Sequence, residues 1–250
     1  MKNFLFFIVL TFFLASCSKD NSQPPRNDSG INIHFTHSVN GENFEELDPS
    51  CCGLPHKNAA GQDYSVMLLK YIISDIKLYK ESGDHLTVKD MHFIDLDDSR
   101  STSINLDSDE YEFVAISFTM GLKNENNSSY QYINYNDTFE GAMAWPEMMG
   151  GGYHYMKMEG KFDNDSTFYN THTGALAMSG MDRMDHSHDV YLDLIPSNSS
   201  ESLHVSINME INHWYNNPVY TLVSDGIMGN MQAQMNLQAN CNDVFSASVR

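Results

Sequence analysis

Basic side chains are scarce in this sequence of 250 residues: 14 Lys and Arg stand against 33 Asp and Glu, for a formal net charge of −19. Nucleic-acid phosphates are held mainly by Lys and Arg, so this balance argues against nucleic acid as a partner. It suits a secreted domain that tolerates or attracts cations.

Long apolar runs are also missing beyond the N-terminus, and the run found there is short. The stretch 4–14 is apolar except for Thr11, and its 11 residues fall short of the roughly 20 that span a bilayer. With Lys2 before it, the stretch is typical of a secretory signal peptide. Residues 14–17 read LASC and resemble the bacterial lipobox. We expect 1–17 to be a lipoprotein signal peptide with Cys17 as the lipid anchor; the alternative is an ordinary signal peptide cut nearby.

The residues after Cys17 indicate location and domain organisation. Ser18 stands where lipoproteins of the inner membrane typically carry Asp, so we expect attachment to the outer membrane. Residues 18–30 (SKDNSQPPRNDSG) are polar and contain two prolines, which predicts a flexible tether. The rest, 31–246, is long enough for a single domain with a sizeable core.

Only four cysteines are present: Cys17, Cys51, Cys52 and Cys241. Neighbouring Cα atoms lie ~3.8 Å apart, below the usual disulfide range, so a bond between Cys51 and Cys52 would be strained. In an oxidising envelope we expect Cys241 to pair with one of them, leaving the other as a free thiol.

Sequence motifs of common enzyme classes are absent. The chain has no G-x-S-x-G, P-loop or H-E-x-x-H motif, and its carboxylates form no diagnostic pair. Nothing demands catalysis, and we expect a binding protein rather than an enzyme.

Alternation of apolar and polar residues dominates the domain and predicts strands. The predicted strands are 31–39, 64–79, 91–96, 103–106, 112–121, 153–159, 190–195 and 203–211. Many strands without long helices between them favour a mainly antiparallel β-sandwich. Near the C-terminus, Met228, Met231 and Met235 are spaced three and four apart, which predicts a short helix with Asp225 as its cap.

Methionine is unusually frequent, with 16 copies. Thioether sulfur is a soft ligand that prefers Cu(I), and imidazole binds copper in either oxidation state. The segment 178–189 (MSGMDRMDHSHD) has little hydrophobic pattern to explain its methionines as core. It is interpreted either as a secondary copper-binding loop or as a solvated loop between strands. Its candidate ligands are Met178, Met181, Met184, His186 and His188.

Several histidines fall on predicted strands. By strict alternation His37 shares a face with Ile33 and Phe35, and His154 shares one with Met156. A lone histidine on an apolar face is usually a core residue, but several imidazoles that meet can bind a metal. The candidate metal ligands are His37, His154, His172 (in the turn NTHTG), Met156 and His92, whereas His85 and His204 are predicted to be exposed.

Eight sequence blocks, in order, resemble the MbnP-like copper-binding domain family of Bacteroidetes lipoproteins. They are INIHFTHSVNGENF, KNAAGQDYSVMLLKYIISDIKLY, MHFIDL, ISFTMGL, AWPEMMGGGYHYMKMEG, THTG, INHWYNNP and NCNDVF. The resemblance implies a mononuclear copper site of histidines with an oxidised tryptophan, a kynurenine made by a dihaem peroxidase-like partner. His37, Trp145 and His172 match motif positions, and His154 is a local addition.

This chain also departs from the family pattern. Many relatives have two tryptophans in the fifth block and a Cys after THTG, and NENN (124–127) replaces an Asn-His pair. The resemblance implies a copper-binding lipoprotein of the cell envelope, held at the membrane by its lipid anchor. The alternative is a metal-free surface lipoprotein that binds protein or glycan. Clustering of His37, His154 and His172 would favour the first.

Overall fold

A computed structural model describes residues 30–44, 54–163, 166–178, 180–195 and 202–249. The predicted signal peptide, Cys17, Cys51 and Cys52 therefore lie outside the described residues. The strands are β1 (Gly30–Val39), β2 (Glu42–Asn43), β3 (His56–Lys57), β4 (Asp63–Tyr64), β5 (Leu68–Tyr79), β6 (His85–Asp95), β7 (Ser103–Leu106), β8 (Ala115–Met120), β9 (His154–Phe162), β10 (Thr167–Gly174), β11 (His188–Asp193), β12 (Ser202–Glu210) and β13 (Phe245–Val249). The α-helices are α1 (Phe139–Met143) and α2 (Met231–Asn240), and five 3₁₀ turns are η1 (Ser99–Thr102), η2 (Asn124–Asn126), η3 (Glu147–Met149), η4 (Ile211–Tyr215) and η5 (Cys241–Asp243).

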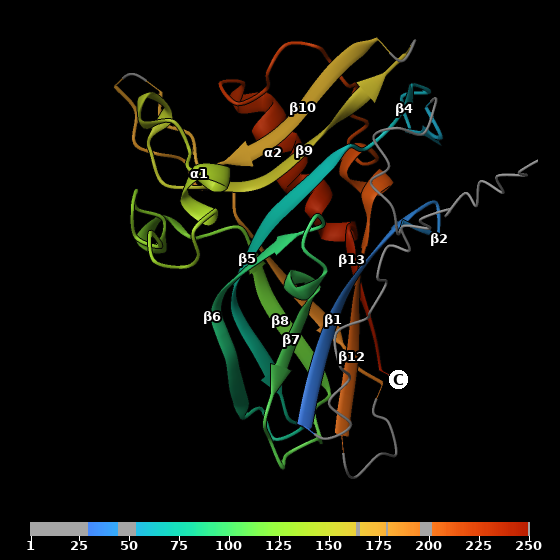
Figure 1. Ribbon diagram of the computed structural model, residues 1–250, viewed down its shortest axis with the longest axis vertical. Helices are drawn as coiled ribbons and strands as arrows, with labels where there is room; N and C mark the ends of the chain where they lie inside the picture. Colours follow the sequence, from blue (N-terminus) through green and yellow to red (C-terminus); the bar gives the residue numbers. More distant parts are fainter. Residues whose placement is uncertain (1–29, 45–53, 164–165, 179, 196–201, 250) are drawn as a thin grey trace, which may run out of the picture.

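The described strands form two sheets (Figure 1). The smaller sheet has the order β13-β12-β1-β2, with β7 also on β1, and the larger has the order β11-β8-β5-β9-β4-β3, with β10 on β9 and β6 on β5. Pairing is antiparallel except between β1 and β12, which run parallel. The predicted mainly antiparallel β-sandwich is confirmed.

The main core lies between the two sheets. Alternation along each strand sends every second side chain to this interior. The smaller sheet contributes Ile31, Ile33, Phe35, Leu203, Val205 and Ile207, and the larger contributes Ile73, Ile76, Leu78, Ile116 and Phe118. Each such side chain stabilises the fold by roughly 1.5–3 kcal/mol relative to exposure.

A second core covers the other face of the larger sheet near one end. Ile72, which neighbours Ile73 and so faces the opposite way, belongs to it, together with Phe93 and Tyr155. Helix α1 closes this core with Phe139 and Met143. Residues 154–156 at the start of β9 and 171–174 at the end of β10 are therefore buried whichever face they point to.

Strand β10 was not predicted, and the turn assigned to His172 is wrong because His172 lies within this strand. Its outward residue Phe168 is 58% exposed while Tyr169 is buried, so apolar residues fall on both faces and hide the alternation. His85 likewise begins β6 but is exposed, as predicted, whereas His204 is half-buried on β12.

Helix α2 begins later than predicted. Its cap is Asn230, whose side-chain oxygen accepts a hydrogen bond from the Ala233 amide at 3.1 Å, so the assignment of Asp225 is wrong. Met235 is exposed, and the buried face includes Gln234. The Gln234 side chain donates from Nε2 to the His172 backbone carbonyl at 2.8 Å, and its Oε1 accepts from the Gly174 backbone N–H at 3.1 Å. The helix is thus tied to β10 by hydrogen bonds rather than by methionine packing.

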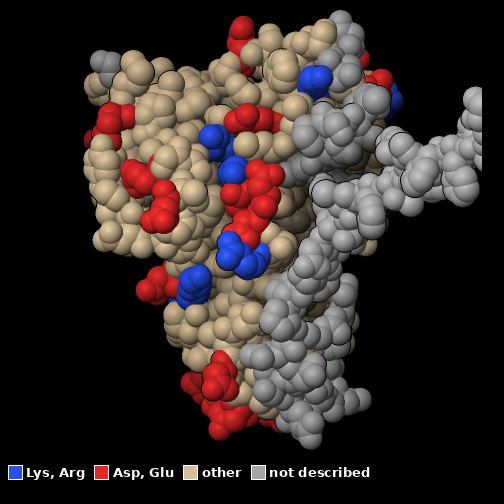
Figure 2. Space-filling model, viewed as in Figure 1, with Lys and Arg blue, Asp and Glu red and all other residues tan. Residues whose placement is uncertain are grey.

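Charged groups are spread over the surface. On the face in Figure 2, Lys and Arg side chains mostly lie beside acidic ones. The least exposed pair joins Lys70 Nζ to Asp95 Oδ2 at 2.7 Å. Within the described ranges, no helix is long and apolar enough to cross a membrane.

Candidate metal centre

An irregularity between β9 and β10 sets the direction of His154. His172 pairs with Lys157 and Thr173 with Met156, but Gly174 pairs with His154, so the register shifts by one residue. An extra residue in one strand of a pair redirects the side chains beside it. His154 therefore lies with His172, and the face predicted for it by strict alternation, that of Met156, is wrong.

His154, His172 and Trp145 form one buried ring cluster. The His154 ring centroid lies 5.0 Å from that of His172 and 4.7 Å from that of Trp145, and both pairs meet edge-to-face. Trp145 follows α1 in sequence and is anchored by its amide, which donates to the Gly152 carbonyl at 2.8 Å. The cluster thus joins α1 to the end of the β9–β10 pair.

The hydrogen bond made by His154 determines which of its two ring nitrogens carries the lone pair. Nδ1 lies 3.1 Å from the Met143 carbonyl oxygen, which can only accept, so Nδ1 carries the hydrogen. Nε2 then has the lone pair, and it is buried without a hydrogen-bond partner among the described residues. Burial, reinforced by nearby His172, lowers the pKa of His154 to about 3, so the ring is neutral at pH 7.

His172 is oriented by a carboxylate. Its Nε2 donates to Glu159 Oε1 at 2.8 Å, and in the neutral ring the lone pair then resides on Nδ1. This hydrogen bond is the main cause that lowers the pKa of Glu159. A histidine that donates one N–H to a carboxylate or carbonyl is the usual arrangement of a metal-binding imidazole. Both His154 and His172 show it.

His37 and His92 point into the inter-sheet core instead. Tyr71 pairs with Met156 on the inner face of the larger sheet, and its hydroxyl lies 3.0 Å from His37 Nε2. His172, paired with Lys157, projects from the opposite face. Both His92 nitrogens have partners: Nε2 donates to the Ser101 carbonyl at 2.8 Å, and Nδ1 accepts from Lys89 at 3.0 Å.

Burial lowers the pKa of His37 to about 3 and, with the Lys89 charge, that of His92 to about 4. Met156 is fully buried in the same inner core. The structure therefore brings together His154, His172 and Trp145 from the predicted set, and it places His37, His92 and Met156 on the other face of the larger sheet.

The segment 178–189 is divided as well. Met178, Met181 and Met184 are exposed, whereas His186 is buried and His188 half-buried. Arg183 anchors the segment by donating to the carbonyls of Asn127 at 2.8 Å and Asn124 at 3.0 Å. The methionines and the histidines thus face different surroundings.

Among the described residues, no group of three or more His, Cys, Asp or Glu is arranged to hold a metal ion. The ring cluster supplies two imidazoles, those of His154 and His172. Burial also raises the pKa of the Cys241 thiol, and the predicted disulfide partners of Cys241 lie outside the described residues.

Comparison with known proteins identifies the family of this chain. The family model named MbnP matches residues 28–246. The chain belongs to the MbnP family. The solved structure of MbnP from Methylosinus trichosporium is similar, with a TM-score of 0.51 and 11% identity over 77% of this chain and 78% of that one, a likeness of fold. No curated protein sequence matches.

Two of the sequence blocks that resemble the family contribute to the ring cluster and its surroundings. In the closing Lys-x-Glu-Gly of AWPEMMGGGYHYMKMEG, Lys157 donates to the Ala142 carbonyl at 3.2 Å and Glu159 orients His172. In THTG, Gly174 lies against the Trp145 indole. Sequence reasoning missed Glu159 as a site residue, although its alternation with Lys157 places both on one strand face.

Proposed function

We propose that this MbnP-family protein is a copper-binding lipoprotein of the cell envelope, attached to the outer membrane, that handles copper and does not catalyse a reaction. The observation that carries the proposal is the His154–His172 pair. Each imidazole has one nitrogen held by an acceptor, the Met143 carbonyl for His154 and Glu159 for His172. His154 Nε2 is buried and has no hydrogen-bond partner among the described residues. Buried polar atoms are almost always satisfied, so this one is explained best by an absent ligand.

The donor set fits copper. Imidazole is a good copper ligand, and affinity for divalent metals peaks at copper. His154 Nε2 and His172 Nδ1 would hold the ion, Met143 and Glu159 would keep the rings in place, and Trp145 would shield the site from water. The family resemblance implies a tryptophan oxidised by a dihaem partner, and we assign that position to Trp145 because it packs on His154.

Copper binding is tested by a double variant, His154→Phe with His172→Gln, which keeps bulk at both positions and removes the two ligands. We expect its copper affinity to fall by roughly tenfold or more relative to the wild type, because both nitrogen donors are lost. Competition titration with a chromophoric chelator on tag-free protein measures this. The control is His85→Gln, an exposed histidine, which is expected to retain wild-type affinity.

Equal copper affinity of the wild type and the double variant would overturn this site. Loss of copper in His37→Phe alone would move the site to the inner face of the larger sheet. A wild type that binds no copper would instead favour the metal-free alternative, in which the same scaffold binds protein or glycan.

Membrane attachment is tested by Cys17→Ser. If Cys17 carries the lipid, this variant is expected to leave the membrane fraction or accumulate as unprocessed precursor, since each buried acyl methylene contributes ~0.8 kcal/mol to anchoring. Fractionation and immunoblotting measure the distribution, and Ser16→Ala serves as the matched control. Normal processing with unchanged membrane partitioning of Cys17→Ser contradicts the anchor.

A further inference from the structure

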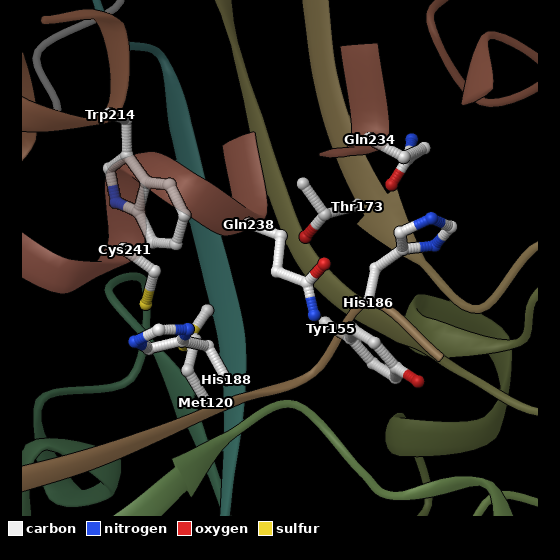
Figure 3. A pocket seen from close by; sticks show the side chains of 9 residues that line it. All are labelled: Met120, Tyr155, Thr173, His186, His188, Trp214, Gln234, Gln238 and Cys241. Carbon is white, nitrogen blue, oxygen red and sulfur yellow. The ribbon is translucent and has the colours of Figure 1, made fainter. Parts of the chain in front are cut away.

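A small cavity lies between helix α2 and the ends of strands β8 and β11. Its volume is about 10 Å³, at the lower limit for holding one water-sized particle. Met120, His188, Cys241, Gln238, His186 and Trp214 are among its lining residues. Figure 3 shows Met120, His188 and Cys241 gathered at one end, with the Cys241 sulfur directed toward the His188 ring.

Pairing of the strands and contacts of the helix bring these three side chains together. Met120 and His188 are opposite residues of the antiparallel pair β8–β11, so their side chains project from one face. Cys241 directly follows α2, and the Gln238 side chain ties that helix to the segment before β11 by donating to the Ser187 carbonyl at 2.8 Å. Met120 and Cys241 are each 2% exposed.

Both histidines of the cavity are prepared to offer a lone pair. Burial lowers the pKa of the half-buried His188, which favours the neutral ring with a lone pair on one nitrogen. His186 Nδ1 lies 3.1 Å from the Gly174 carbonyl, and its Nε2 is buried without a partner among the described residues. This Nε2 belongs to a side chain that is 5% exposed, so the cavity wall includes a buried polar atom without a partner among the described residues.

We propose that Met120, His188 and Cys241 form a second metal site, specific for Cu(I), distinct from the His154–His172 pair. Thiolate, thioether and imidazole are together a soft donor set, which favours Cu(I) over harder ions. A single thiolate neutralises one positive charge, so Cu(I) is buried without net charge, whereas Zn(II) would leave a charge uncompensated. His186 lines the opposite end and completes the polar wall.

Loading of this site needs no redox step. The Cys241 S–H bond breaks, a sulfur–copper bond forms, and the proton leaves to solvent while copper stays Cu(I). His188 is half-buried and is the most accessible of the three proposed donors. The exposed Met178, Met181 and Met184 lie in the segment leading to His188 and supply soft sulfur outside the cavity.

The test uses anaerobic Cu(I) titration of the reduced full chain in detergent, in the His154→Phe and His172→Gln background that lacks the first site. This background is expected to retain one Cu(I). Adding Met120→Leu or Cys241→Ala is expected to weaken it by roughly tenfold or more, because each removes one of three donors. Met235→Leu, an exposed methionine on α2, is the matched control and is expected to have no effect.

X-ray absorption at the copper edge supplies a second readout, in which sulfur neighbours are expected and are lost in the double sulfur variant. Circular dichroism verifies folding, and Met120→Leu preserves volume. The proposal is overturned by equal Cu(I) affinity in all variants, by a copper shell without sulfur, by Zn(II) binding that the same variants abolish, or by mass spectrometry that finds Cys241 in a disulfide. If the His154–His172 pair binds no copper, these measurements still test the second site, because they use a background that lacks both of those histidines.

Discussion

A Gly160→Ala variant is expected to lose roughly 3 kcal/mol or more of unfolding free energy, because overpacking against backbone leaves little room to relax. A Cβ at this position would overlap the Ser65 carbonyl oxygen and lie 2.8 Å from its carbon and 3.0 Å from Tyr169 Cε1. The chain around Ser65 is held against β9, since its amide donates to the Lys161 carbonyl at 2.8 Å.

The Tyr169 side chain holds the same contact from the other side. Tyr169 pairs with Gly160 across β9 and β10, and its hydroxyl donates to the Ser65 carbonyl at 2.9 Å. The backbone at Ser65 therefore cannot move away from Gly160 without breaking this hydrogen bond. Urea denaturation of the two proteins measures the loss. Gly141→Ala, in α1 with open space around its Cβ, is the control and is expected to be neutral or slightly stabilising. A Gly160→Ala midpoint equal to that of the wild type would contradict the expectation.

A Gly174→Ala variant is expected to damage both stability and the ring cluster. Its Cβ would lie 2.8 Å from Trp145 Cε3 and 2.9 Å from two more indole carbons. The indole also contacts His154, so it cannot move away without disturbing that ring. We expect a loss of roughly 1–3 kcal/mol in unfolding free energy. Copper affinity should fall by about tenfold or more, since His154 is displaced.

Two measurements separate these effects. Urea denaturation reports stability, and copper competition under fully folded conditions reports the site. The control is Gly226→Ala, whose added Cβ has no atom within 4 Å. Weakened copper binding with unchanged stability would show that the added methyl group acts mainly on the His154 ring. Lower stability with unchanged copper binding would show that it acts mainly on packing against Trp145. Wild-type behaviour in both assays would show that the Gly174–Trp145 contact does not position the cluster.

Much of the fold follows from local pattern. Strands such as 31–39 and 203–211 alternate regularly, and the structure places Ile33 and Val205 in the inter-sheet core as alternation requires. The ordered sequence blocks were sufficient to predict the family, because each block is a short local pattern that can be read directly from the sequence. In THTG, for example, His172 belongs to the ring cluster and Gly174 packs against its Trp145.

Long-range contacts explain what the sequence could not show. A one-residue register shift turns His154 away from Met156, and it depends on how β10 pairs with β9 rather than on either strand alone. Helix α2 uses Gln234 to bind β10, an interaction that has no signature in hydrophobic spacing.

The sequence by itself determined the chemistry available to this protein: acidic charge, soft methionine sulfur, and histidines on apolar strands. It also determined most strands, because alternation is local. Only the tertiary structure decided which donors meet. His37 and His172 occupy opposite faces of the larger sheet, His154 joins His172, and Met120 meets Cys241 across residues far apart in the chain. Ligand geometry depends on strand pairing and helix docking, and neither is encoded in the spacing of a single segment.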